Sequence, residues 1–244
     1  MSNRGGVSSN VGVRQELSDS PDTLVQAGSR LASHTGFYSR TGKRLFDFLS
    51  CAVGLILLAP ILLIIAVLVK SSSRGPVLFR QQRVGKDGKL FWILKFRSMV
   101  DGANHTGKGI TPKGDPRVTL LGIFLRKWKL DELPQLWNVL IGEMSLVGPR
   151  PELPSYVVGY TSEQKLVFKV RPGITDPASV RYRDEGGVLE RSSDPELLYR
   201  EKILPEKLLL NLQYLKEISF RRDLSLLLST VTSIVRSSEA EKRG

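Results

Sequence analysis

The chain of 244 residues is long enough for one core domain with accessory segments, and a hydrophobic content of 41% is sufficient to build that core. A single cysteine excludes disulfides within the chain and cysteine-rich zinc sites, and two widely separated histidines exclude a histidine-based metal cluster, so any bound metal would be held by oxygen. The net charge of +12 indicates an anionic partner, either nucleic acid or an anionic membrane surface.

The first segment, residues 1–38, is rich in Ser, Gly and Asn and has no apolar periodicity, which predicts disorder. It is followed by an almost entirely apolar run from Phe48 to Val69. At the helical rise per residue this run reaches about 30 Å, which is enough to cross the core of a bilayer. A soluble nucleic-acid binder has no need for such a run. We therefore expect membrane lipids as partners and no nucleic acid.

Pro60 lies in the middle of the apolar run, where a proline removes a backbone hydrogen bond and bends a helix. Lys and Arg lie on both sides of the run, and such residues favour the cytoplasmic side of a membrane. Both basic ends of a bent helix can lie on the cytoplasmic side if the helix enters the membrane and returns to the same face. Residues 39–74 are therefore predicted as a re-entrant membrane helix hairpin. A straight single span is the alternative.

Beyond residue 74, two β-prone runs flank the turn sequence G-K-D-G, which predicts a β-hairpin. Lys95 and Arg97 alternate on the second strand and either contact an anionic ligand or form a solvated edge. We expect residues 75–237 to form a cytoplasmic catalytic domain of mixed helices and strands, and residues 238–244 to be a polar tail.

A helix is predicted around Pro134, because proline is well tolerated in a first helical turn; it begins near Leu133 and ends at Gly142. Asp131 and Glu132 come just before it. The free N–H groups and the dipole at a helix start favour anions and also bind phosphates. Ordinary helix capping is an equally good explanation of these two acids from this stretch alone.

Arg126 and Arg150 flank the two acids. The rigid fork of donors in Arg matches phosphate geometry, so two arginines beside paired carboxylates can hold a diphosphate. Farther along, the leucine spacing after Pro205 predicts an amphipathic helix, and Asp223 is expected to cap a last helix of similar character. Each of these helices packs either on the core or at the membrane interface.

Several linked motifs resemble the bacterial sugar transferases, which are monotopic polyprenol-phosphate phosphoglycosyl transferases. They run in the family's order over roughly residues 40 to 235: K-R-L-F-D before the apolar run, then K-F-R-S-M, L-D-E-L-P-Q-L-W-N-V-L, M-S-L-V-G-P-R-P-E and P-G-I-T. The resemblance implies transfer of a phospho-sugar from a UDP-sugar to polyprenol (undecaprenyl) phosphate with release of UMP and with Mg²⁺ as cofactor. It also implies a re-entrant helix in the inner membrane, with the catalytic domain on the cytoplasmic face.

In the same resemblance, Asp131 and Glu132 match the family's acidic dyad, and Arg126 and Arg150 match its phosphate-binding arginines. The helix break lies at Ala59-Pro60 here, where the family has Ser-Pro, and the residues after P-G-I-T also depart from the family pattern.

Asp131 is the expected nucleophile, forming a covalent aspartyl phospho-sugar, and Glu132 is expected to assist with the metal or with a proton. Both carboxylates are expected to be ligands of the metal. The expected fold class is α+β, with amphipathic interfacial helices after the membrane helix. The alternative function is a non-catalytic, single-pass membrane protein with a basic cytoplasmic binding domain.

Overall fold

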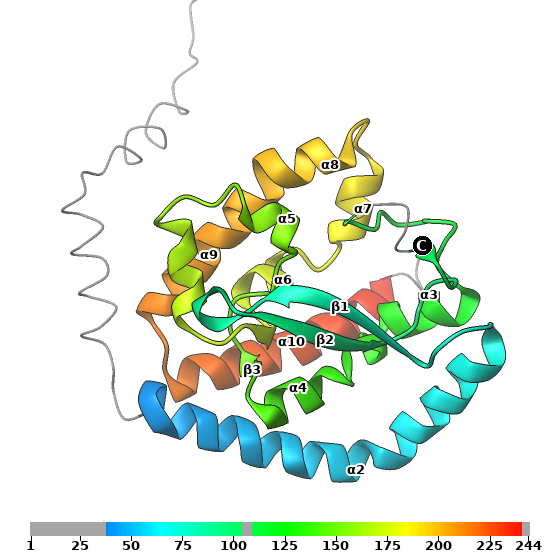
Figure 1. Ribbon diagram of the computed structural model, residues 1–244, viewed down its shortest axis with the longest axis horizontal. Coiled ribbons are helices and arrows are strands. Elements are labelled where there is room, and N and C mark those ends of the chain that lie inside the picture. The colour runs from blue at the N-terminus through cyan, green and yellow to red at the C-terminus, as the bar shows by residue number, and fades with distance from the viewer. Residues whose placement is uncertain (1–37, 104–108, 241–244) are drawn as a thin grey trace, which may run out of the picture.

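The computed structural model describes residues 38–103 and 109–240, which combine helices with two small sheets in an α+β arrangement (Figure 1). The elements in chain order are η1 Tyr38–Gly42, α2 Lys43–Ser72, β1 Leu78–Val84, η2 Lys86–Gly88, β2 Leu90–Phe96, α3 Leu120–Lys127, η4 Leu130–Glu132, α4 Gln135–Ile141, β3 Ser145–Val147, α5 Pro154–Val157, η5 Gln164–Lys169, β4 Gly173–Thr175, α6 Pro177–Arg181, α7 Glu185–Glu190, α8 Pro195–Leu198, η6 Tyr199–Ile203, α9 Leu204–Lys216 and α10 Phe220–Ala240.

The predicted disorder of residues 1–38 lies outside the described residues except at Tyr38, which begins η1. The predicted polar tail, 238–244, is described only as far as Ala240, and that part continues α10 instead of forming a separate segment.

The apolar run forms one continuous helix, α2, of 30 residues with Pro60 inside it. Figure 1 shows this helix curved along one edge of the molecule, and its two halves do not fold back on each other as the two arms of a hairpin would. By length and composition it could cross a membrane. Few of its side chains are buried: Asp47, Cys51, Ile65 and Val69. Its predicted re-entrant position in a bilayer stays a prediction.

The buried side chains of α2 fix the helix to the rest of the chain at two places. Cys51 packs in one apolar cluster with residues of β2 and α4, namely Phe91, Ile93, Val139 and Met144. Ile65 and Val69 pack in a second cluster with Phe96 and Leu125. Because the carboxyl end of α2 meets the end of β2 and the buried side of α3, it lies close to the elements that carry the candidate site.

The predicted hairpin is confirmed. Strands β1 and β2 pair antiparallel with Leu78 opposite Phe96 and Val84 opposite Leu90. Asp87 and Gly88 in the turn both have a positive φ, which is the conformation that tight hairpin turns require. The hairpin thus places the side chains of β2 at fixed positions beside α4 and η4.

A second sheet joins β3 and β4 in parallel, with Ser145 opposite Gly173 and Val147 opposite Thr175. The backbones approach so closely beside this pair that a Cβ on Gly173 would lie 2.1 Å from the backbone nitrogen of Gly148. Only glycine fits there. The contact fixes the loop after β3, which carries Arg150.

The helix predicted after Pro205 is confirmed as α9, which buries Leu208, Tyr214 and Leu215 on one face. The last helix, α10, is also present and exposes a stripe of apolar side chains: Phe220, Leu224, Leu228, Val231 and Val235. The position of either helix at a membrane interface stays a prediction.

The predicted capping role of Asp223 is wrong. Asp223 lies inside the first turn of α10, fully buried, and its carboxylate accepts hydrogen bonds from the hydroxyls of Tyr214 (2.6 Å) and Tyr38 (2.7 Å). It also forms an ion pair with Lys43 at the start of α2. A buried carboxylate with these three donors is well compensated, so Asp223 links the first and last described helices and caps neither.

Candidate active site

A cavity of about 1220 Å³ lies between the hairpin, the loop of residues 109–117, the end of α3 and the segment around α6 and α7. It is lined by both candidate carboxylates, Asp131 and Glu132, and by all four candidate cations, Lys95, Arg97, Arg126 and Arg150. The structure therefore brings together residues that are spread over more than fifty positions of the sequence.

The segment from α3 to α4 positions the two acids. Helix α3, Leu120–Lys127, is capped at its start by Thr119, whose side chain accepts a hydrogen bond from the Gly122 nitrogen at 3.0 Å. One short 3-10 turn, η4, then carries Asp131 and Glu132. The helix predicted to end at Gly142 is α4, which stops there because Gly142 adopts φ 90°, a conformation that glycine reaches without strain. The predicted position of the acids just before α4 is confirmed.

Glu132 is held by two cations from distant parts of the chain. Its Oε1 lies 2.7 Å from Nζ of Lys95 on β2 and 3.1 Å from Nη2 of Arg150 in the loop after β3. Burial opposes ionisation of this carboxyl, but Lys95 and Arg150 outweigh burial and hold the pKa of Glu132 well below its usual range. The two cations thus favour the ionised form of Glu132, which in turn holds both of them in place.

The same contacts act differently on the two cations. The Glu132 carboxylate raises the pKa of Arg150 above its ordinary value. Burial lowers the pKa of Lys95, and the attraction of Glu132 only partly offsets this. The backbone N–H of Arg150 also donates to Asp176 Oδ2 at 3.1 Å, which fixes the loop. The side chains of Lys95 and Arg150 are therefore held in fixed positions in the cavity wall.

Asp131 lies next to this network without being part of it. It is 6% exposed, it lines the cavity, and its Oδ1 accepts no hydrogen bond from any of the described residues. Burial first, and then the negative charge of Glu132, raise the pKa of Asp131. A buried carboxylate that lines a cavity and has an oxygen without a partner is a candidate to bind a cation or to react with a ligand.

Arg126 reaches the cavity from the last turn of α3. Its Nε donates to Ser98 Oγ at 2.8 Å. Burial lowers the pKa of its guanidinium, whereas the nearby charge of Asp131 acts in the opposite direction. One edge of the guanidinium is thus fixed by Ser98 while the side chain lines the cavity near Asp131.

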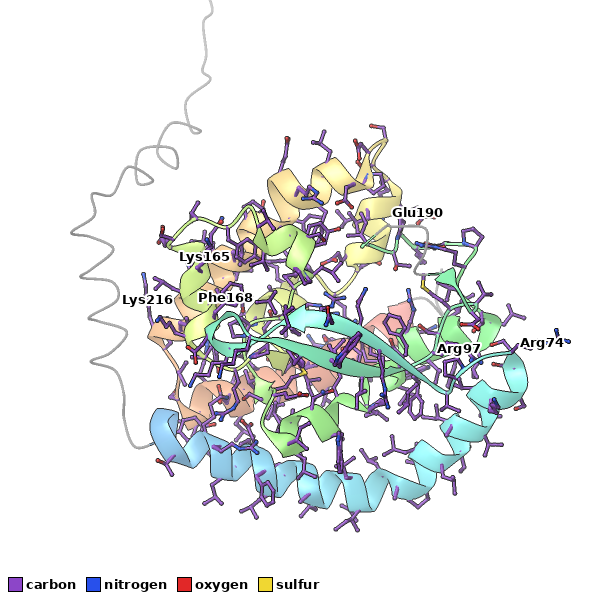
Figure 2. The ribbon with its side chains drawn as sticks, in the orientation of Figure 1. Arg74, Arg97, Lys165, Phe168, Glu190 and Lys216 are labelled. Atoms are coloured by element: carbon purple, nitrogen blue, oxygen red, sulfur yellow. The ribbon has the colours of Figure 1, made fainter. Side chains whose placement is uncertain are left out.

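The predicted contact between Arg97 and an anionic ligand has no support in the geometry. Its guanidinium donates to the carbonyl oxygens of Val69 (3.0 Å), Ser73 (2.7 Å) and Pro76 (2.5 Å) at the carboxyl end of α2. Figure 2 shows Arg97 between the end of the hairpin and the end of α2, while Arg74 points away. A cation that binds the last carbonyls of a helix stabilises its end, so Arg97 joins α2 to the wall of the cavity.

Sequence reasoning missed a polar network at another part of the cavity wall. Glu152 is at its centre: its Oε1 accepts a hydrogen bond from the Tyr199 hydroxyl at 2.9 Å, and its Oε2 lies 3.9 Å from Nη1 of Arg83. Lys207 Nζ lies 4.0 Å from Glu152 Oε1 and 2.8 Å from Glu185 Oε2. All five side chains line the cavity. Lys207 is the residue whose position in the sequence could have indicated this network, because a charged residue within a leucine-rich helix face is unusual.

No group of three or more His, Cys, Asp and Glu side chains that could hold a metal occurs in the described ranges 38–103 and 109–240. Mg²⁺ is commonly bound by one or two carboxylates together with substrate phosphates and water. Asp131, with its unpartnered Oδ1, fits that pattern. Glu132 fits less well, because its Oε1 is already engaged by Lys95 and Arg150.

A model of the bacterial sugar transferase family matches residues 38–237. The chain is 47% identical over 164 residues to the UDP-glucose:undecaprenyl-phosphate glucose-1-phosphate transferase of Klebsiella pneumoniae, with 64% of this chain and 35% of that protein aligned. It is 37% identical over 205 residues to the undecaprenyl-phosphate glucose phosphotransferase of Komagataeibacter xylinus, with 81% of this chain and 36% of that protein aligned.

A third relative is similar in length. The chain is 39% identical over 198 residues to the exopolysaccharide production protein PSS of Rhizobium leguminosarum bv. phaseoli, and the alignment covers 78% of this chain and 94% of that protein. The chain thus spans about a third of the length of the first two relatives and nearly all of the third.

Proposed function

Because the chain belongs to the bacterial sugar transferase family, we propose that it transfers a phospho-sugar from a UDP-sugar to undecaprenyl phosphate, with release of UMP. The names of the relatives support this reaction class, since two of them are undecaprenyl-phosphate sugar phosphotransferases. The observation that carries the proposal is the buried Asp131 side chain, which lines a cavity together with several cations and whose Oδ1 has no partner among the described residues.

In the first step, a carboxylate oxygen of Asp131 attacks the phosphorus that bears the sugar. A bond forms between that oxygen and the phosphorus, the bond from the phosphorus to the bridging oxygen of the diphosphate breaks, and UMP leaves with the electron pair. Arg126 and Arg150 neutralise charge on the diphosphate while this happens, which is the main demand of phosphoryl transfer. The product on the protein is an aspartyl phospho-sugar.

In the second step, a phosphate oxygen of the lipid attacks the same phosphorus. The bond to Asp131 breaks, the carboxylate is regenerated, and a polyprenol-diphosphate-sugar leaves. Neither step consumes an oxidant or a further co-reactant. Since UMP leaves before the acceptor reacts, while the phospho-sugar stays on Asp131, one set of cations can serve both steps.

Glu132 acts as a positioning residue. Its Oε1 is shared between Lys95 and Arg150, so it orients the cations that face the diphosphate and has little freedom to attack. Adjacent residues at the start of a helix also point in different directions, which favours one nucleophile rather than two. The expectation that Glu132 assists with the metal or with a proton stays a prediction.

Mg²⁺, when bound, would neutralise part of the charge of the diphosphate. Asp131 is the residue that fits it best, with Glu132 as the neighbouring carboxylate. Addition of EDTA should abolish UMP release, and full activity in EDTA would reject this assignment.

The lipid substrate requires a site at a membrane surface. We place α2 in the inner membrane as a re-entrant helix, bent at Pro60, with both ends and the catalytic residues on the cytoplasmic side. Arg97 then connects the returning end of α2 to the wall of the cavity through the carbonyls of Val69 and Ser73. The polyprenol tail stays in the bilayer while its phosphate enters the cavity.

The proposal is tested with the purified full chain, undecaprenyl phosphate and a panel of UDP-sugars that includes UDP-glucose, UDP-galactose and UDP-N-acetylgalactosamine. Multiple-turnover UMP release should require the lipid, one donor should be preferred, and Asp131→Asn should be inactive. If no donor gives lipid-dependent UMP, the chain is better described as a non-catalytic membrane protein with a basic binding domain.

A further inference from the structure

Lys129 adopts an unusual backbone conformation between the two helical segments that carry the site. Its φ of 56° and ψ of 19° lie in the left-handed region. Among the described residues, only Asp87 shares a positive φ without being glycine, and Asp87 lies in the hairpin turn. A residue with a Cβ is strained in this region whereas glycine is not, so the presence of lysine at this position calls for an explanation.

The side chain of Lys129 lines the cavity and is only partly buried. It forms no hydrogen bond or ion pair with any of the described residues, in contrast to Lys95 and Arg150, which are both engaged by Glu132. Burial raises the pKa of Asp131, and the positive charge of Lys129 is one of those that oppose this effect. The ammonium group thus lies near the reacting carboxylate and is available to a ligand.

The backbone at Lys129 also determines which side of the cavity it faces. The left-handed residue reverses the chain between α3 and η4, so Arg126 precedes it and Asp131 follows it within the same wall. The positive charge of Lys129 acts on both Asp131 and Glu132, and among the described residues its side chain is not engaged as those of Lys95 and Arg150 are.

Helix α3, which ends two residues before Lys129, presents an exposed apolar face. Leu120, Ile123 and Phe124 are spaced at helical intervals and are 89%, 56% and 52% exposed, and Ile123 also lines the cavity. An exposed apolar helix face that continues into two cations suits a ligand with a long hydrocarbon tail and a phosphate head. A soluble nucleotide has no use for such a face.

We propose that Lys129, together with Arg126, binds the phosphate of the polyprenol acceptor, whose tail lies along the apolar face of α3. This inference rests on the proposed function and assigns the acceptor to the α3 side of the cavity. Arg126 first neutralises the donor diphosphate together with Arg150, and once UMP has left it is available to the acceptor phosphate. In this proposal the charge of Lys129 serves the second step, which accounts for a lysine where glycine would be unstrained.

Three substitutions separate the charge of Lys129 from its backbone. Lys129→Arg keeps the charge, Lys129→Ala removes the charge and keeps the strain, and Lys129→Gly removes both. We expect the KM for undecaprenyl phosphate to rise about tenfold in the Ala and Gly variants and less than about threefold in Lys129→Arg, because one charge-assisted contact is lost in the first two only. The KM for the UDP-sugar should change by less than about twofold in all three.

Thermal unfolding gives a second readout. Lys129→Gly should melt at or above the temperature of wild type, because glycine accepts the left-handed conformation without strain, even though its acceptor KM is raised. Asp87→Gly relieves the equivalent strain in the hairpin turn, away from the cavity, and should leave both KM values unchanged.

The outcomes are distinguishable. An unchanged acceptor KM in Lys129→Ala and Lys129→Gly, or a rise in the donor KM instead, would overturn the role of Lys129 while leaving the proposed function intact. A raised acceptor KM in Lys129→Gly alone would assign the effect to the backbone and also overturn it. Failure of the proposed function itself would appear as a wild-type protein that releases no UMP with any donor and lipid.

Discussion

Glu132 and Lys95 form an ion pair of 2.7 Å in the wall of the cavity, and the same carboxylate oxygen lies 3.1 Å from the guanidinium of Arg150. One oxygen therefore orients two cations that are supplied by β2 and by the loop after β3. The negative charge that does this also lies beside Asp131, where it favours the protonated form of that carboxyl. Positioning of the cations and reactivity of the nucleophile are thus linked through Glu132.

The first prediction concerns pH. Attack requires ionised Asp131, and burial together with the Glu132 charge raises the pKa of Asp131. As pH falls through this raised pKa, kcat/KM for the UDP-sugar should decrease, at a pH above that of an ordinary aspartate, whose pKa is about 3.9. The pH profile of UMP release, measured where the protein remains folded, checks this.

Glu132→Gln provides the matching variant. Removal of the neighbouring negative charge should lower the pKa of Asp131, so the acid limb of the profile should move to lower pH even though the maximal rate falls. Glu217→Gln changes an exposed carboxylate whose side chain is 61% exposed and should leave the profile unchanged. An acid limb that moves to higher pH in Glu132→Gln would contradict the linkage.

The second prediction concerns Arg150. Charge-assisted contacts to a phosphate contribute about 1.5 to 3 kcal/mol each, so Arg150→Ala should lower kcat/KM by roughly ten- to a hundredfold or more. Arg150→Lys should recover only part of this, because an ammonium group lacks the two-pronged geometry of guanidinium. Steady-state kinetics check both. Arg222→Ala removes an exposed ion pair with Glu217 and serves as the control, and an Arg150→Ala enzyme as active as wild type would remove Arg150 from the site.

The third prediction concerns membrane topology. If α2 is re-entrant, both its ends face the cytoplasm, and Pro60→Leu should shift the helix toward spanning because it restores the missing backbone hydrogen bond. Single cysteines introduced at Ser9 and at Lys86, in a Cys51→Ser background, can be labelled with a membrane-impermeant maleimide in intact and inverted vesicles. Labelling of the two positions from opposite faces of the wild-type membrane would establish a simple span.

Local sequence signals predicted the elements that depend on nearby residues. The turn chemistry around Asp87 and Gly88 predicted the hairpin, and Pro134 with Gly142 predicted the ends of α4 within two residues. These features are set by φ preferences and missing N–H groups, which act over a few residues. The parallel pair of β3 and β4 was not predicted, because three-residue strands are too short to show a periodicity.

Contacts between distant segments set the rest of the site. A basic residue on a strand can bind a ligand or another part of the chain, and the sequence does not distinguish these roles: Lys95 lines the cavity beside Glu132, whereas Arg97, two residues later, binds the end of α2. Asp223 resembled a helix cap but is buried against Tyr214. In each case the residue that determines the role of the side chain lies more than eight positions away in the sequence, so a local sequence pattern does not reveal it.

The last prediction concerns the nucleophile. Asp131→Asn keeps the shape of the side chain but replaces a carboxylate with a weakly nucleophilic amide, so turnover should fall to near background while the melting temperature changes little. Mass spectrometry of the protein mixed with UDP-sugar and Mg²⁺, without the lipid, should detect a phospho-sugar on the peptide that contains Asp131, together with about one UMP released per protein. Asp131→Asn should show neither. Addition of undecaprenyl phosphate should then remove the adduct, and the kinetics should be ping-pong, because UMP leaves before the acceptor reacts. An adduct on Glu132, or UMP release that strictly requires both substrates to be present, would reject the covalent role of Asp131.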